Sequence, residues 1–175
     1  MRPYVFCIAT ALAVSAVSGA AYAADPDTAV YHRLSTEFRG TDLPLDVVNG
    51  GPKNNQTQLA KFGNFSGQFW RFSPIGNGYF KLTTEFRGTN MCLDIFNGGP
   101  RNNQPHLTTC ANVTGQAWKI VADGSWFRLK TQFRGDGMCL DVFNGGANNN
   151  QPHLVACANL SGQKWRLAPT TKRVN

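Results

Sequence analysis

The chain has 175 residues, of which 42% are hydrophobic and 15% charged, and its formal net charge is +7 at pH 7. This length suits one domain with a buried core and argues against several independent domains. The basic balance has two interpretations: it keeps a domain soluble, or it attracts an anionic partner such as an acidic glycan. Lysine and arginine are scattered without a dense run, so we expect no nucleic-acid partner.

The first 23 residues have the pattern of a secretory signal peptide. Arg2 precedes an apolar run, and small residues then lead to Ala21-Tyr22-Ala23. The run is too short to span a membrane comfortably, and no later stretch is a candidate span. We therefore expect cleavage near Ala23, export to the periplasm or the extracellular space, and an N-terminal extension over residues 24–30.

Three similar units follow, over residues 31–78, 79–125 and 126–168. Each unit contains a Phe-Arg-Gly segment, a Leu-Asp pair and a Gln-x-Trp segment. The aspartates are 48 and 47 residues apart, since 94 − 46 = 48 and 141 − 94 = 47; they are Asp46, Asp94 and Asp141. Repeats at this spacing indicate one structural unit used three times.

Within each unit, short alternating runs are separated by turn residues. In the third unit these runs are Trp126–Lys130, Met138–Val142, His153–Cys157 and Lys164–Leu167. Four strands per unit predict an all-β fold of twelve strands that closes around a shared core. The recurring Trp70, Trp118 and Trp165 are predicted core residues, and the tail 169–175 is predicted to be disordered.

Four cysteines remain after Cys7 leaves with the signal peptide. In an exported protein an even count favours disulfides over a metal site. Four cysteines permit three pairings. The equal spacing of 18 residues in two similar units favours the pairing in which Cys92 bonds Cys110 and Cys139 bonds Cys157. Each would stabilise the fold by about 3 kcal/mol.

Cys-Leu-Asp near the start of a unit and Gln-x-Trp near its end resemble the ricin-type β-trefoil lectins over residues 31–168. The resemblance implies a β-trefoil with pseudo-threefold symmetry and a shallow sugar pocket in each unit. In that family the aspartate accepts hydrogen bonds from sugar hydroxyls, and the glutamine of Gln-x-Trp holds the aspartate. The implied function is a secreted, non-catalytic carbohydrate-binding protein with one to three pockets and no cofactor.

The candidate site residues follow from this resemblance and from the polar loop after each aspartate. In the second unit they are Asp94, Asn97, Asn103, His106 and Gln116, with Phe96 as a stacking ring. In the third they are Asp141, Asn144, Asn150, His153 and Gln163, with Phe143 as a stacking ring. The alternative is structural: the aspartates cap turns or only bond the glutamines, the rings fill space, and the histidines bond backbone.

The first unit offers a poorer version of the same set, namely Asp46, Asn49 and Gln68. Pro44 and Phe62 stand where the other units have cysteines, so its loop lacks a disulfide. Gln58 replaces the histidine and Val48 replaces the phenylalanine of the other units. We expect this unit to bind feebly or not at all and to be mainly structural.

Two departures from the family argue against a galactose-type pocket built on the usual groups. Many members carry an aromatic residue two positions before the second cysteine, where this chain has Ala60, Thr108 and Val155. Members also often have asparagine just before the glutamine, where this chain has Gly67, Gly115 and Gly162.

Three further questions concern the arginines, the partner and catalysis. Arg39, Arg87 and Arg134 are either solvated turn residues or a positive ring that selects acidic glycans. A trefoil of this kind also occurs as the cell-binding subunit of a toxin or as a protein-binding inhibitor, which would imply a second secreted chain. An enzyme is not expected, because glycoside hydrolysis needs two carboxylates and each unit offers one recurring aspartate.

Overall fold

The computed structural model describes residues 25–174, so the predicted signal peptide lies outside the described residues. Twelve strands and five single-turn 3₁₀ helices make up this part of the chain, which contains no α-helix. None of its helices is long and apolar enough to cross a membrane. The predicted all-β class is confirmed.

The strands follow the three units, here called lobes 1, 2 and 3 (31–78, 79–125 and 126–168). Lobe 1 contains β1 (Val30–Thr36), β2 (Leu45–Val47), β3 (Thr57–Leu59) and β4 (Trp70–Gly76). Lobe 2 contains β5 (Tyr79–Thr84), β6 (Gly88–Ile95), β7 (Pro105–Thr109) and β8 (Trp118–Asp123). Lobe 3 contains β9 (Trp126–Thr131), β10 (Met138–Val142), β11 (Pro152–Ala156) and β12 (Trp165–Arg173). The 3₁₀ helices are η1 (Gly51–Lys53), η2 (Ser66–Gln68), η3 (Gly99–Arg101), η4 (Thr114–Gln116) and η5 (Ser161–Gln163).

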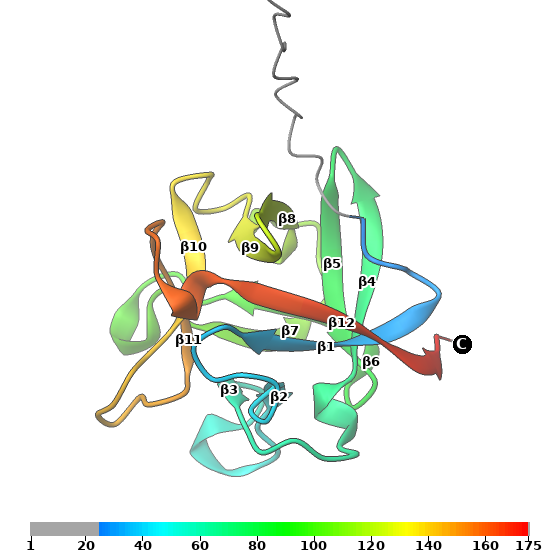
Figure 1. Cartoon of the computed structure of the whole chain (residues 1–175), viewed down its shortest axis with the longest axis horizontal. Coiled ribbons are helices and arrows are strands. Elements are labelled where there is room, and N and C mark those ends of the chain that lie inside the picture. Colours follow the sequence, from blue (N-terminus) through cyan, green and yellow to red (C-terminus); the bar gives the residue numbers. More distant parts are fainter. Residues whose placement is uncertain (1–24, 175) are drawn as a thin grey trace, which may run out of the picture.

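Six strands form a closed barrel (Figure 1). Their hydrogen-bonded order is β4-β1-β12-β9-β8-β5, and β4 pairs with β5 to complete the ring. The remaining strands form one antiparallel hairpin per lobe: β2 with β3, β6 with β7, and β10 with β11. A six-stranded barrel with three hairpins is a β-trefoil, so the predicted architecture is confirmed.

The three recurring tryptophans are fully buried, as the sequence predicts. Each indole N–H donates to the carbonyl of the leucine before the lobe's aspartate: Trp70 to Leu45, Trp118 to Leu93 and Trp165 to Leu140, at 2.8–2.9 Å. Burial of a large ring together with a satisfied N–H stabilises the joint between hairpin and barrel. Each aspartate therefore lies directly beside a core anchor.

Both predicted disulfides are present, each with a Cα–Cα separation of 4.9 Å. The prediction for the tail is wrong over residues 169–173. These residues continue β12, which pairs with β1 from Thr36 opposite Trp165 to Val30 opposite Arg173. These residues form a strand because the first half of β1, far away in the sequence, pairs with them: His32 lies opposite Pro169 and Val30 opposite Arg173.

Candidate functional site

The aspartate of each lobe occupies the same place in its hairpin and makes the same two hydrogen bonds. Oδ1 accepts the N–H of the next residue at 2.7 Å, and Oδ2 accepts the glutamine Nε2 of Gln-x-Trp at 3.0–3.1 Å. The pairs are Asp46 with Gln68, Asp94 with Gln116, and Asp141 with Gln163. The glutamine's implied role of holding the aspartate is seen in all three lobes.

Each glutamine is itself held at both ends of its amide. Gln68 Nε2 also donates to Lys61 O at 2.9 Å, and its Oε1 accepts from Gly63 N at 3.2 Å and Arg33 Nη1 at 2.8 Å. Burial lowers the pKa of Arg33, while the charge of Asp46 raises it. The carboxylate is therefore presented in one fixed orientation by a buried, fully bonded amide.

The carboxylates keep unused capacity for a ligand. An ionised carboxylate has about four acceptor positions, and two of them are used within the protein. Asp46 and Asp94 are partly exposed, whereas Asp141 is 8% exposed. The side chains in lobes 1 and 2 thus combine fixed geometry with access to solvent.

The glycine before each glutamine lies against the carboxylate. A Cβ built on Gly67, Gly115 or Gly162 would lie 2.1–2.2 Å from Oδ1 of the same lobe's aspartate. No real side chain can approach so closely. With the aspartate in this position, only glycine fits before the glutamine.

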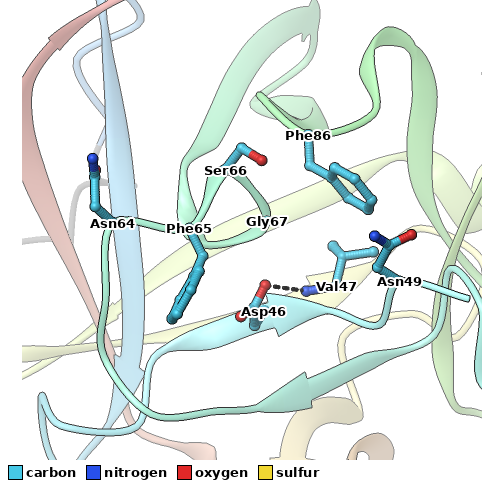
Figure 2. Close-up of a pocket in the computed structure, with 8 residues that line it drawn as sticks. All are labelled: Asp46, Val47, Asn49, Asn64, Phe65, Ser66, Gly67 and Phe86. Atoms are coloured by element: carbon cyan, nitrogen blue, oxygen red, sulfur yellow. Dashed lines mark hydrogen bonds between the residues drawn. The ribbon is translucent and has the colours of Figure 1, made fainter.

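A hollow of about 360 Å³ opens beside the aspartate of lobe 1 (Figure 2). Its lining residues are Asp46, Val47, Asn49, Asn64, Phe65, Ser66, Gly67 and Phe86. The Phe65 ring stands next to the carboxylate, with Asn49 and Phe86 across the hollow, and Phe65 is 57% exposed. The lining contains one carboxylate and no basic side chain. An aromatic face beside a fixed acceptor is suited to a ring with both apolar and hydroxyl surfaces.

Sequence reasoning missed Phe65 because it looked for the aromatic residue before the cysteine position. Equivalent positions in the other lobes hold aliphatic residues, Val113 at 48% exposure and Leu160 at 50%. A signal was available: each lobe places one apolar residue inside the polar turn before Gly-Gln. An apolar residue that recurs on an exposed turn is a candidate for ligand contact.

The predicted stacking rings of lobes 2 and 3 pack within the protein. The His106 ring lies parallel to Phe96 with 3.7 Å between centroids, and the His153 ring lies 3.6 Å from Phe143. The Arg101 guanidinium lies 4.4 Å from the Phe96 centroid. Because His106 occupies one face of the Phe96 ring, the guanidinium occupies the other face. A sugar therefore has no free face on Phe96, and the structural alternative describes this ring.

Partial burial also affects the two histidines that cover these rings. It lowers the pKa of His106, with the charge of Asp94 raising it and that of Arg101 lowering it further. Burial likewise lowers the pKa of His153, opposed by Asp141. Both imidazoles are thus favoured in the neutral form, which suits a ring stacked on phenylalanine.

The predicted asparagines divide into two groups. Asn49, Asn97 and Asn144 are exposed at the turns beside the aspartates. Asn103 and Asn150 have a positive φ, as does Asn55 in lobe 1. Their carbonyls accept a backbone N–H from the next lobe at 2.7–2.8 Å: Asn55 from Leu107, Asn103 from Leu154 and Asn150 from Leu59. We therefore assign these three asparagines to the joints between lobes.

The three arginines of Phe-Arg-Gly also join lobes. Each guanidinium lies over the preceding phenylalanine ring at 4.0–4.2 Å and donates to an asparagine in the glycine-rich loop of a neighbouring lobe. The bonds run from Arg39 to Asn149, from Arg87 to Asn54 and from Arg134 to Asn102, at 2.7–2.8 Å. The three guanidinium groups are neither freely solvated nor gathered into an open positive ring, which were the two roles considered from the sequence. They connect neighbouring lobes instead.

Among residues 25–174, no His, Cys, Asp and Glu side chains form a group that could hold a metal ion.

Comparison with known proteins places the chain in a family. The model of the ricin-type beta-trefoil lectin domain matches residues 31–165. The designed threefold-symmetric protein ThreeFoil is similar with a TM-score of 0.66 and 24% identity, over 79% of this chain and 97% of that one. The Rhizoctonia solani agglutinin has a TM-score of 0.64 and 18% identity, over 85% and 100%. A mosquitocidal holotoxin has a TM-score of 0.69 and 14% identity, over 82% of this chain and 17% of its own. At these identities the structural likeness shows the fold, and no curated protein sequence matches the chain.

Proposed function

The chain belongs to the ricin-type beta-trefoil lectin family, whose domain binds carbohydrate, and from this premise we propose that it is an exported lectin for neutral glycans with its leading pocket in lobe 1. The export is supported by the signal pattern of residues 1–23 and by two disulfides, which persist in oxidising surroundings. The protein binds its glycan without changing it.

The observation that carries the proposal is the position of the Phe65 ring next to the Asp46 carboxylate at the lobe 1 hollow (Figure 2). The Asp46 carboxylate, oriented by Val47 N and Gln68 Nε2, accepts hydrogen bonds from two neighbouring sugar hydroxyls. Charged acceptors form the stronger hydrogen bonds available to a neutral ligand. Phe65 covers the apolar face of the same sugar ring, and Asn49 supplies an amide at the opposite wall.

This assignment reverses the order of lobes expected from the sequence. The sequence predicts that lobe 1 is mainly structural, because it lacks the cysteine pair, the histidine and the phenylalanine of the other lobes, yet it has an exposed ring beside its aspartate. Lobes 2 and 3 have Val113 and Leu160 there, and Asp141 is 8% exposed. We propose weaker binding at Asp94 and the weakest at Asp141, with strength on a polyvalent surface arising from simultaneous engagement.

The chemistry of the pocket favours neutral over acidic glycans. None of the residues lining the lobe 1 hollow is Lys, Arg or His. The arginines that could have formed a positive ring donate instead to Asn54, Asn102 and Asn149. An anionic sugar at Asp46 would place like charges together, which is unfavourable.

A glycan array tests the proposal. The wild type should give a signal on neutral glycans that persists in high salt, because screening weakens contacts between charges far more than contacts to neutral hydroxyls. Asp46→Asn and Phe65→Ala should each remove most of that signal. Asp42→Asn is the matched control, since Asp42 is an exposed carboxylate of the same lobe outside the hollow.

Two results would overturn the proposal. One is an array without signal at high protein concentration; the other is binding that Asp46→Asn and Phe65→Ala leave unchanged. Recovery of a second secreted chain that free sugars do not displace would favour the alternative of a protein-binding trefoil.

A further inference from the structure

Lobe 1 has no disulfide, yet its loop follows the same path as the loops that have one. Phe62 N donates to Asp42 O at 2.8 Å, as Cys110 N does to Asn90 O and Cys157 N to Gly137 O at 2.9 Å. Phe62 therefore stands in the place of the second cysteine of lobes 2 and 3. Some other contact must fasten the loop at this point.

That contact is a guanidinium held between two rings. The Arg33 Cζ lies 4.4 Å from the centroid of Phe62 and 4.4 Å from the centroid of Phe69. Arg33 comes from β1, Phe62 from the loop after β3, and Phe69 from the residue after η2. A cation over an aromatic ring is stabilising, more so when it is partly removed from water. The sandwich thus ties three separate segments of lobe 1 together.

The same guanidinium reaches the site through the glutamine. Arg33 Nη1 donates to Gln68 Oε1 at 2.8 Å, and Gln68 Nε2 donates to Asp46 Oδ2 at 3.0 Å. Any movement of Arg33 therefore changes the support of the Asp46 carboxylate. Because Arg33 acts on the pocket through Gln68, its role is that of a positioning residue.

The matching positions in the other lobes lack the two rings, although Arg128 keeps the hydrogen bond to its lobe's glutamine. Lys81 and Arg128 replace Arg33, and they donate to Ala111 O and to Gln163 Oε1. At the position of Phe69 these lobes have Ala117 and Lys164. The two-ring sandwich and the disulfide thus replace one another: lobe 1 has the sandwich, and lobes 2 and 3 have the cystine.

We infer that Arg33, clamped by Phe62 and Phe69, is the non-covalent equivalent of the disulfide in lobe 1 and makes its site independent of redox conditions. Reduction opens the loops of lobes 2 and 3 and leaves that of lobe 1 closed. The use of this site for sugar rests on the proposed function; the fastening of the loop does not.

Amide hydrogen exchange of the oxidised and reduced protein tests the inference. The reporting amides are Gly63 in lobe 1, Ala111 in lobe 2 and Ala158 in lobe 3, each of which donates to its lobe's glutamine Oε1. In the wild type, reduction should speed exchange at Ala111 and Ala158 and leave Gly63 unchanged. Faster exchange at Gly63 on reduction of the wild type would overturn the inference.

Substitution of Arg33 should open lobe 1 alone. Arg33→Ala should speed exchange at Gly63 and Val47 by roughly tenfold to a hundredfold, the range expected for loss of two ring contacts and one charged hydrogen bond. Arg33→Lys keeps the charge but not the flat group, so it should also speed exchange. Lys81→Ala is the matched control and should act on Ala111 only. Wild-type exchange at Gly63 in Arg33→Ala would contradict the inference.

A disulfide should rescue the damaged lobe. Adding Pro44→Cys and Phe62→Cys to Arg33→Ala gives lobe 1 the cysteine arrangement of the other lobes. Slow exchange at Gly63 should return in the oxidised protein and disappear on reduction. A bond that forms, as verified by mass, without slowing Gly63 would show that the sandwich does something other than fasten the loop.

A sugar arm separates this inference from the proposed function. Galactose and N-acetylglucosamine serve as probes of Val47 exchange, because Val47 N donates to Asp46 Oδ1. Sugar protection of Val47 that is lost in Arg33→Ala supports the positioning role, and protection that persists there overturns it. If neither sugar protects the wild type, the proposed function is weakened, while the exchange results at Gly63 still decide the role of Arg33.

Discussion

A methyl group on Gly115 would lie 2.1 Å from the carboxylate Oδ1 of Asp94. The glycine is needed for space rather than for an unusual backbone angle, since its φ is not in the left-handed region. Glycine and aspartate are thus matched parts of one site, and the same match recurs at Gly67 with Asp46 and at Gly162 with Asp141.

Gly115→Ala should therefore displace the Asp94 side chain and break its two hydrogen bonds, lowering the free energy of unfolding by about 1–3 kcal/mol. Urea unfolding measures the loss. Gly137→Ala is the control, because a Cβ there would meet nothing within 4 Å. Equal stability of the two variants would contradict the close fit.

The apolar residue in the turn before Gly-Gln should set how strongly each lobe binds sugar. It is Phe65 in lobe 1, Val113 in lobe 2 and Leu160 in lobe 3. Val113→Phe should give lobe 2 the ring that lobe 1 has, and strengthen sugar binding there by about fivefold, the value of one aromatic contact. Titration by NMR can follow the Ile95 amide, which donates to Asp94 Oδ1. The Val47 amide of lobe 1 is the internal control and should titrate as in the wild type. An unchanged Ile95 response would show that this position lies off the sugar path.

Arg87 should stabilise the fold by joining lobes 1 and 2. Arg87→Ala removes the contact with the Phe86 ring and the hydrogen bond to Asn54, so we expect a loss of about 1 kcal/mol in the free energy of unfolding. The loss should persist in high salt because the acceptor is neutral. Lys53→Ala removes the same charge from an exposed residue of the loop that Arg87 contacts, and should be silent. A loss no larger than that of Lys53→Ala would argue against the joint.

Three buried or partly buried histidines make stability depend on pH. The pKa of His32, His106 and His153 is lowered below the usual 6.5, mainly by burial. The unfolded chain then binds more protons than the folded one, so stability is full above pH 6.5 and falls as the pH drops through 6.5 toward the folded-state values.

Replacing all three histidines should make stability nearly independent of pH between pH 7 and about pH 5, where most carboxylates remain ionised. The variant carries His32→Phe, His106→Gln and His153→Gln. The replacements are residues already found at matching positions, Phe80 and Gln58. Thermal unfolding across this interval provides the measurement. If the thermal stability of the variant falls as steeply with pH as that of the wild type, groups other than these histidines cause the fall.

The repeat made much of the fold predictable from sequence. Strands, buried tryptophans and both disulfides follow from the unit's own pattern, because each depends on residues close together in the chain. The strand at 169–173 was missed since its composition is polar and turn-like. It forms because β12 pairs with β1 as far as Val30 opposite Arg173, and a partner so distant in the sequence leaves no local pattern.

The site was only partly predictable for a related reason. The bond from Gln116 to Asp94 follows from the family resemblance. The arginine contacts with Asn54, Asn102 and Asn149 connect lobes, so a comparison of units with one another could not show them. The stacking of His106 on Phe96, the residue after β6, depends on the register between β6 and β7, in which Asp94 pairs with His106.

The arginine contacts between lobes run in one direction around the ring: each unit donates from its arginine to one neighbour and accepts from the arginine of the other. A head-to-tail contact that is repeated three times to form a closed ring is the kind of interface found in a cyclic trimer. A peptide containing a single unit already carries both the donor and the acceptor. Three separate copies could thus assemble into the same ring, with the polypeptide links between units serving to fix stoichiometry rather than shape.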